Sequence, residues 1–244
     1  MGGMHDGPPL FEMDAPEWAY GVGVFDLETT GIDVERDRIV TAHVGVLGPD
    51  GAVRRSRAWM ADPGVEIPAE ASAVHGISSA QARAQGRPAA EVVAEVVDTL
   101  RAVFAAGYPV VAYNAPFDFS MLRHEAVRHG VEPIDRPSPV IDPLVLDKFM
   151  DRYRPGRRTL SVVAEHYRVV LADAHDASAD AVAAGRVALA LAERFGPSLP
   201  RTAGELHTRQ ISWARLQAES LTEYFVRIGR IDPEERLDGR WPIR

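Results

Sequence analysis

The apolar positions of the chain change from strand-like to helix-like spacing along its length. Three early segments are rich in β-branched residues and bounded by Gly, Pro or Asp, which predicts strands at 22–25, 38–47 and 52–60. The turn signal Gly48-Pro49-Asp50-Gly51 joins the last two and predicts an antiparallel hairpin. The arginines of the third segment suit an exposed sheet edge, where charge blocks unwanted pairing.

The second part of the chain is mainly helical in pattern. Residues 61–79 form a stretch punctuated by Pro and Gly, after which residues 88–106 carry an apolar stripe that ends at Gly107. Short apolar runs at 110–112 and 139–142 predict two more strands. Further helices are expected at 119–129, 143–150, 160–167, 176–195 (with Asp176 as N-cap) and 202–228. This order predicts an α/β fold with a mixed five-stranded sheet flanked by helices.

Length and pattern suggest three parts in the 244 residues. We expect a mobile N-terminal leader at 1–17, a main domain at 18–197 and a C-terminal helical extension at 198–244. The leader is rich in Gly, Pro and acids and lacks the pattern of a signal peptide. The extension presents a roughly continuous apolar face, so it packs on the main domain or serves as a contact for a homodimer or another protein partner.

Composition narrows the functional classes. The chain has no cysteine, which excludes disulfides, zinc–thiolate sites and a cysteine nucleophile and fits a cytoplasmic location. No apolar run is long enough to span a bilayer, so we expect no membrane association. The net charge of −8 argues against a nucleic-acid binder, but only in part, because bound cations can offset a cluster of site acids.

Two carboxylates stand at the end of the first predicted strand. Asp26 and Glu28 follow an apolar run, and residues two apart in a strand point the same way. Neighbouring carboxylates repel each other unless a cation lies between them, and Mg²⁺ prefers oxygen ligands. Two other Asp-x-Glu pairs, at Asp33 and Asp232, lie in polar turns and are interpreted as solvated. The first pair is therefore the candidate metal site.

Three more residues carry candidate chemistry. Asp118 follows a short buried strand and opens a helix, and Asp180 lies in the late Ala-rich helix. His175 precedes Asp180 by five residues, which is about 140° around an ideal helix, so the two would not share a helical face. We therefore expect His175 in the loop before the helix, leaning over the metal site.

These residues carry a family resemblance. Asp26-Leu-Glu28-Thr-Thr-Gly, Asn114-Ala-Pro-Phe-Asp118 and His175-Asp-Ala-Ser-Ala-Asp180 resemble, in order and spacing, the three motifs of the DEDDh exonucleases. The family includes the proofreading subunit of bacterial DNA polymerase III, ribonuclease T and oligoribonuclease, and the similarity spans about residues 21–195. It implies a ribonuclease H-like fold and removal of nucleotides from nucleic-acid 3′ ends.

The resemblance also implies roles for these residues. The four acids would hold two Mg²⁺ or Mn²⁺ ions about 4 Å apart, an arrangement suited to in-line displacement at phosphorus. His175 would accept the proton of the attacking water, since histidine titrates near neutral pH. The expected products are nucleoside monophosphates from single-stranded or frayed DNA or RNA.

Other positions match family substrate contacts and also have ordinary structural explanations. Leu27 and Thr29 correspond to positions that line the terminal nucleotide, or they simply pack in their strand. His75 contacts nucleotide or orders its turn, and Phe117 wedges against a base or packs in the core. Asn114, the only asparagine, is expected to shape its turn.

The densest basic run is Arg152-Tyr-Arg154-Pro-Gly-Arg157-Arg158, which either follows a phosphate backbone or forms a solvated loop. Asp142, Asp147 and Glu165 are interpreted as structural. Two other functions remain open, namely a non-catalytic nucleic-acid-binding module of the same fold and a metal-dependent small-nucleotide phosphohydrolase.

Overall fold

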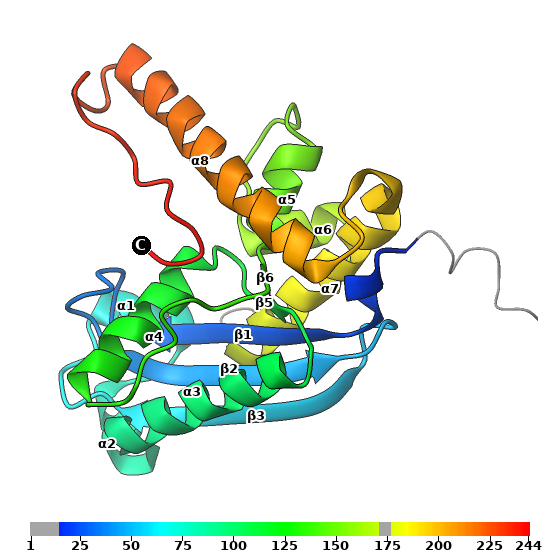
Figure 1. Ribbon diagram of the computed structural model, residues 1–244. Coiled ribbons are helices and arrows are strands. Elements are labelled where there is room, and N and C mark those ends of the chain that lie inside the picture. Colours follow the sequence, from blue (N-terminus) through cyan, green and yellow to red (C-terminus); the bar gives the residue numbers. More distant parts are fainter. Residues whose placement is uncertain (1–14, 171–176) are drawn as a thin grey trace, which may run out of the picture.

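The computed structural model describes residues 15–170 and 177–244. A six-stranded sheet in the order β4-β3-β2-β1-β5-β6 lies at its centre (Figure 1). The strands are β1 (Val22–Thr29), β2 (Ile39–Leu47), β3 (Val53–Asp62), β4 (Arg87–Pro88), β5 (Val110–Val111) and β6 (Val140–Ile141). The pairs β1–β2 and β2–β3 are antiparallel, whereas β3–β4, β1–β5 and β5–β6 are parallel, so the sheet is mixed as predicted.

Strand prediction succeeded where the chain alternates over a long stretch. The β2–β3 hairpin forms at the predicted turn, where Gly51 has a φ of 70° and its N–H bonds to the carbonyl of Gly48. The sixth strand, β4, was missed because it has only two residues and directly precedes a helix. It pairs with Ala61 and Asp62 alone, so the arginine-bearing half of β3 is an exposed edge.

Helices cover both faces of the sheet. They are α1 (Ala69–His75), α2 (Ser79–Gln85), α3 (Ala89–Ala105), α4 (Pro116–Arg128), α5 (Pro143–Met150), α6 (Leu160–His166), α7 (Ala177–Phe195) and α8 (Ala203–Arg227), with short 3-10 turns η1 (Glu17–Tyr20) and η2 (Gly196–Ser198). A Cβ on Gly23 would meet Val103 of α3, whereas Val24, on the opposite face of β1, faces Gly185 of α7. The sheet is therefore enclosed between α3 and α7.

The stretch 61–79 is more ordered than its punctuation indicated. It includes α1, which ends at Gly76 with a φ of 75°, and leads to α2, whose N-cap Ser78 accepts a hydrogen bond from the N–H of Gln81 at 3.2 Å. Each of these helices has seven residues, about two turns, which is too short for a helical period to appear in the sequence.

Small residues bring α7 close to the sheet. Ala181, Ala184 and Ala188 are buried, and a Cβ added to Gly185 would lie 2.5 Å from Val24 Cγ1. A larger side chain at this position would push the helix away from β1. The Ala-rich composition of α7 therefore sets how closely the first turn of the helix approaches the end of β1.

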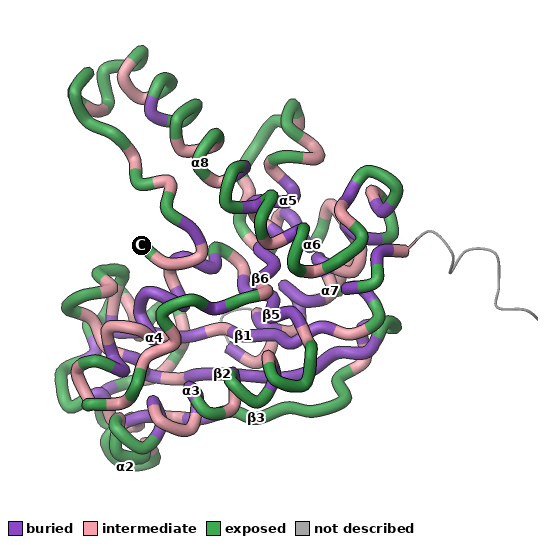
Figure 2. Tube along the Cα trace, in the orientation of Figure 1, coloured by how far each residue is buried: buried purple, intermediate pink, exposed green. Residues whose placement is uncertain are grey.

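The C-terminal helix packs on the main body through its first half. Trp213 is buried and stacks on Phe149 of α5 with 4.0 Å between ring centroids. The second half of α8 is mostly exposed (Figure 2), including the apolar residues Leu216, Leu221 and Tyr224. The chain then turns back and ends beside α4 (Figure 1). In the described part of the chain, no helix is both long and apolar enough to cross a membrane.

Candidate active site

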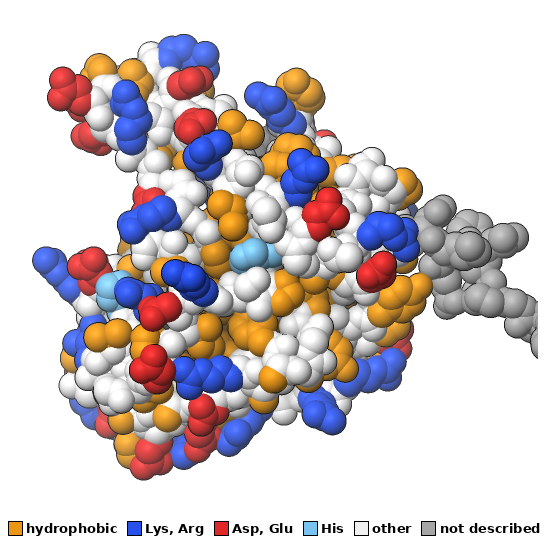
Figure 3. All heavy atoms as spheres, viewed as in Figure 1, with side chains coloured by type: hydrophobic (Ala, Val, Ile, Leu, Met, Phe, Trp, Pro, Cys, Tyr) orange, Lys and Arg blue, Asp and Glu red, His pale blue; other side chains and the backbone are white. Residues whose placement is uncertain are grey.

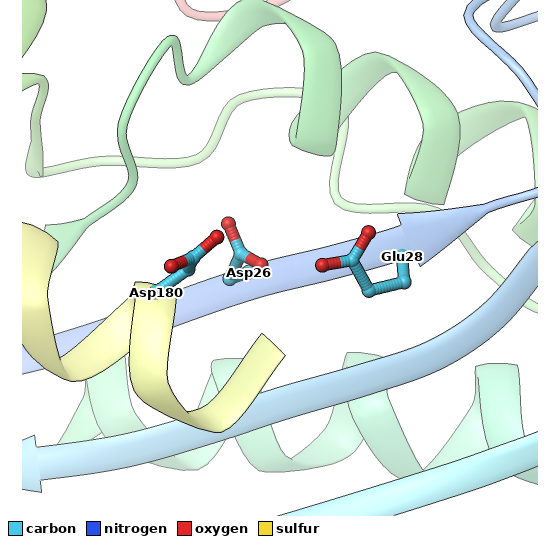
Figure 4. Close-up of side chains that lie close together, drawn as sticks. All are labelled: Asp26, Glu28 and Asp180. Carbon is cyan, nitrogen blue, oxygen red and sulfur yellow. The ribbon is translucent and has the colours of Figure 1, made fainter. Parts of the chain in front are cut away.

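The first strand presents two acids on one face. Asp26 and Glu28 are half-buried, whereas Phe25, Leu27 and Thr29 between and beside them are buried. This alternation follows from the two-residue period of a strand, as the sequence predicted. Both carboxylates lie over β1 on the side where α7 begins (Figure 4).

Asp180 completes a cluster of three carboxylates. It lies in the first turn of α7, and one oxygen from each of Asp26, Glu28 and Asp180 lies within 4.8 Å of the other two. Figure 4 shows the three side chains converging from β1 and α7. Residues more than 150 positions apart in the sequence are thus brought together, as the family resemblance implies. Carboxylate oxygens at this separation form a donor set suited to a hard divalent cation.

Asp118 lies beside this cluster and is held by the backbone of β1. Its Oδ1 accepts a hydrogen bond from the N–H of Leu27 at 3.1 Å, and Leu27 separates the two acids of the strand. The N–H of Gly23 lies on the same edge of β1 as that of Leu27 and donates to the carbonyl of Pro109, just before β5, at 2.8 Å. Because β5 ends at Val111, it does not extend as far as Leu27. Asp118 therefore supplies the acceptor that a longer β5 would have provided.

The environment of Asp118 favours its neutral form in the metal-free protein. The residue is only 3% exposed, and burial raises its pKa well above the ordinary value. The N–H of Leu27 opposes this shift, while the negative charges of Asp142 and Glu28 add to it. A cation near this carboxylate would lower the pKa of Asp118, because an opposite charge favours the ionised form.

Asp142 has a role that the sequence conceals. It is 1% exposed, and burial raises its pKa, whereas the N–H groups of Asn114, Leu144 and Ala115 and the indole of Trp241 oppose that shift. The interpretation of Asp142 as structural is correct, but its partners include the turn that precedes Asp118. In the sequence, only the position of Asp142 between a strand end and Pro143 indicated that it could hold a turn. Nothing in the sequence indicated that Trp241 would bond to it.

The predicted substrate residues surround the end of β1. Leu27 is 5% exposed, and the Thr29 hydroxyl donates to the carbonyl of Gly31 at 2.6 Å, so both have structural roles in the strand. His75 Nδ1 accepts from the N–H of Ile77 at 3.1 Å; burial lowers its pKa, and an interaction with the backbone of Thr29 partly opposes the shift. Phe117 is half-buried against the core.

One sequence interpretation of the motif region is confirmed, and another falls outside the described residues. Asn114 has a φ of 62°, the left-handed conformation expected of a residue that shapes a tight turn. His175 and the expected N-cap Asp176 lie outside the described residues.

The basic run divides into a buried and an exposed half. Arg154 donates to both carboxylate oxygens of Asp147 at 2.6 Å, and Arg158 donates to one of them at 2.6 Å. Asp147 is fully buried, so these two arginines neutralise a structural acid. Arg152, Tyr153 and Arg157 remain exposed and available to a ligand.

The comparisons with known proteins identify the family of the chain. Residues 24–188 match the RNase T family model, described as Exonuclease, and the chain belongs to this exonuclease family.

The curated relatives are much longer proteins, and the chain aligns with only a part of each. A DNA polymerase III of the PolC type from Lacticaseibacillus paracasei is 31% identical over 168 residues, covering 69% of this chain and 11% of that protein. A DNA polymerase III subunit epsilon-like protein from Rhodobacter capsulatus is 35% identical over 125 residues, covering 50% and 16%. The chain thus spans about a tenth to a sixth of the length of these relatives.

Solved exonuclease I structures share the fold. The Escherichia coli enzyme in complex with a dT13 oligonucleotide has a TM-score of 0.61 at 20% identity, covering 72% of this chain and 41% of that one. The enzyme from Methylocaldum szegediense has a TM-score of 0.61 at 21% identity, covering 84% and 45%.

Proposed function

We propose that the protein is a divalent-metal-dependent 3′→5′ exonuclease that acts on single-stranded or frayed DNA ends. The observation that carries this proposal is the convergence of Asp26, Glu28 and Asp180 within 4.8 Å, beside the buried Asp118. Family membership supports the reaction class, and the relatives that are named as DNA polymerase III favour DNA over RNA.

The residues present fit Mg²⁺ or Mn²⁺. All donors are carboxylate oxygens, which hard cations prefer, and their mutual repulsion is relieved by positive charge. Asp26, Glu28 and Asp180 would hold two ions together with Asp118. Such ions, when bound, supply Lewis acidity that activates water and stabilises the leaving oxygen.

The chain's own residues orient the reaction. Asp118 is hydrogen-bonded to the backbone between the two acids of β1, which links the start of α4 to the strand. We assign the terminal nucleotide to the end of β1, beside His75 and the backbone at Leu27. We assign His175 as the base that takes the proton of the attacking water at a ring nitrogen. The phosphorus–O3′ bond breaks, the 3′ oxygen gains a proton, and a nucleoside 5′-monophosphate is released.

The surface is compatible with a substrate that enters by its end. Positive and negative side chains alternate over the face in Figure 3, without a broad region of one sign. The net charge of −8 also disfavours tight non-specific binding along a duplex. With this net charge, we place recognition at the 3′ terminus and at the exposed residues Arg152, Tyr153 and Arg157.

A degradation assay tests the proposal. Single-stranded DNA and RNA labelled at the 5′ end are incubated with Mg²⁺, with Mn²⁺ or with chelator, and the products are resolved by length. We expect a ladder that shortens from the 3′ end only with metal. Asp26→Ala should abolish it, and Asp232→Ala, from a solvated Asp-x-Glu pair, is the matched control.

Each alternative outcome has a defined meaning. Faster cleavage of RNA would reverse the substrate preference. A folded protein that binds oligonucleotides without cutting them would indicate a binding module. Hydrolysis of free nucleotides alone would indicate a small-nucleotide phosphohydrolase.

A further inference from the structure

One buried carboxylate holds the turn that leads into Asp118. Asp142 Oδ1 accepts from the N–H of Asn114 at 3.0 Å, and its Oδ2 accepts from the N–H of Ala115 at 3.0 Å. The same Oδ1 accepts from the N–H of Leu144 at 3.0 Å. Since Asn114 is in a left-handed conformation that few residues adopt, these bonds fix an otherwise costly turn.

The C-terminal segment reaches this carboxylate. Trp241 is 6% exposed, and its Nε1 donates to Asp142 Oδ2 at 3.3 Å. Among the described residues it is the only side chain that donates to Asp142, because the other donors are backbone N–H groups. The N–H of Arg244 donates to Ser120 Oγ in α4 at 2.9 Å, two residues beyond Asp118.

Helix α8 holds the same junction from another side. Gln210 is fully buried, its Oε1 accepts from the N–H of Asp142 at 2.7 Å, and its Nε2 donates to the carbonyl of Val140 at 3.0 Å. The extension therefore contacts both the backbone and the side chain of Asp142. One of its contacts with the body is thus the residue that supports the loop of Asp118.

The segment between these contacts borders a pocket on α8. Leu237 N–H donates to Thr222 Oγ1 at 3.1 Å, and a cavity of about 310 Å³ lies between α8, α5 and the following residues. The segment is thus anchored to α8 at one end and to Asp142 and α4 at the other. Loss of the Trp241 contact would leave the Asp142 carboxylate with backbone donors alone.

We propose that Trp241 is a positioning residue for the nuclease reaction, which acts through Asp142 and the Asn114–Ala115 turn to place Asp118 against β1. The inference rests on the proposed function for its catalytic consequence. Its structural consequence, a tighter turn at Asn114 and Ala115, is independent of catalysis. The C-terminal segment then supports the active site through Asp142 and has no direct contact with substrate or metal.

The test compares two buried tryptophans. Trp241→Phe keeps an aromatic ring and removes the indole donor, whereas Trp213→Phe alters a tryptophan that stacks on Phe149. Both proteins are checked by thermal unfolding. Amide hydrogen exchange at Asn114 and Ala115 is then measured by mass spectrometry, together with kcat as a function of Mn²⁺ concentration.

We expect Trp241→Phe to raise amide exchange at Asn114 and Ala115, and to raise the Mn²⁺ concentration for half-maximal rate roughly tenfold, with kcat partly recovered at high Mn²⁺. Trp213→Phe should lower the unfolding temperature without either change. If Trp241→Phe does not fold, Ser120→Ala, which releases the end of the same segment, is measured in the same two ways.

The outcomes are distinct. Unchanged exchange and unchanged Mn²⁺ dependence in a folded Trp241→Phe protein would overturn the inference and leave Trp241 as ordinary core. Equal changes in Trp213→Phe would do the same. A wild-type protein without nuclease activity would contradict the proposed function, but the exchange measurement would still decide whether Trp241 holds the turn.

Discussion

Removal of one acid from the cluster should abolish the response of the protein to divalent cations. The perturbation is Asp180→Asn, which keeps the size of the side chain and removes its charge. Asp180 lies within 4.8 Å of both Asp26 and Glu28, so the substitution eliminates two of the three charge pairs.

The magnitude follows from the geometry. At 4.8 Å, each pair of unit charges repels by about 3.5 kcal/mol at an effective dielectric constant of about 20, and by about 0.9 kcal/mol in bulk water. The half-buried cluster lies between these limits, so a bound cation relieves several kcal/mol of repulsion. A ligand at 100 times its Kd stabilises the folded state by about 2.7 kcal/mol. For a chain of this size that corresponds to a rise of about 5–10 °C in Tm.

The assay is thermal unfolding with and without saturating Mn²⁺. We expect the full rise in Tm for the wild type and a rise below about 2 °C for Asp180→Asn. Glu193→Gln, an exposed acid on the same helix, is the control and should keep the wild-type response. An equal shift in Asp180→Asn and wild type would show that the cation binds elsewhere, and would refute the assignment of the cluster.

Three further predictions concern buried charges. Burial raises the pKa of Asp118, so the folded state binds its proton more tightly than the unfolded state. The free energy of unfolding of the metal-free protein should therefore fall as pH rises from 3.8 through the raised pKa. Denaturant unfolding of Asp118→Asn should lack this pH dependence. Burial lowers the pKa of Lys148, so its charged form costs stability at pH 7, and Lys148→Met should raise Tm; a lower Tm would contradict this. Arg154→Ala leaves Asp147 with one fewer partner and should cost about 3 kcal/mol in urea unfolding, whereas exposed Arg152→Ala should cost almost nothing.

The sequence predicted those features that repeat along the chain or depend on local spacing. Strand alternation places Asp26 and Glu28 on one face, and the Ala-rich pattern of α7 predicts a helix that carries Asp180. The hairpin of β2 and β3 follows from its turn residues. These features are local, so a single sequence contains the information.

Features that depend on distant partners were not predictable. Nothing near Trp241 indicates that it bonds to Asp142, which is 99 positions away. The basic run does not reveal that Arg154 and Arg158 face a buried acid, because charge in a sequence carries no sign of burial. The short elements β4, α1 and α2 are held by tertiary contacts rather than by their own periodicity.

The early end of β5 has a consequence for how this site could be lost or engineered. The N–H of Leu27 can donate to one acceptor, which is either a carbonyl of a neighbouring strand or the carboxylate of Asp118. An insertion that extended β5 by two residues would complete the sheet and displace the carboxylate at the same time. Sheet completion and the position of Asp118 therefore compete for a single backbone hydrogen bond. Under the proposed function, a design that made the sheet more regular would remove Asp118 from the site and lower the nuclease activity.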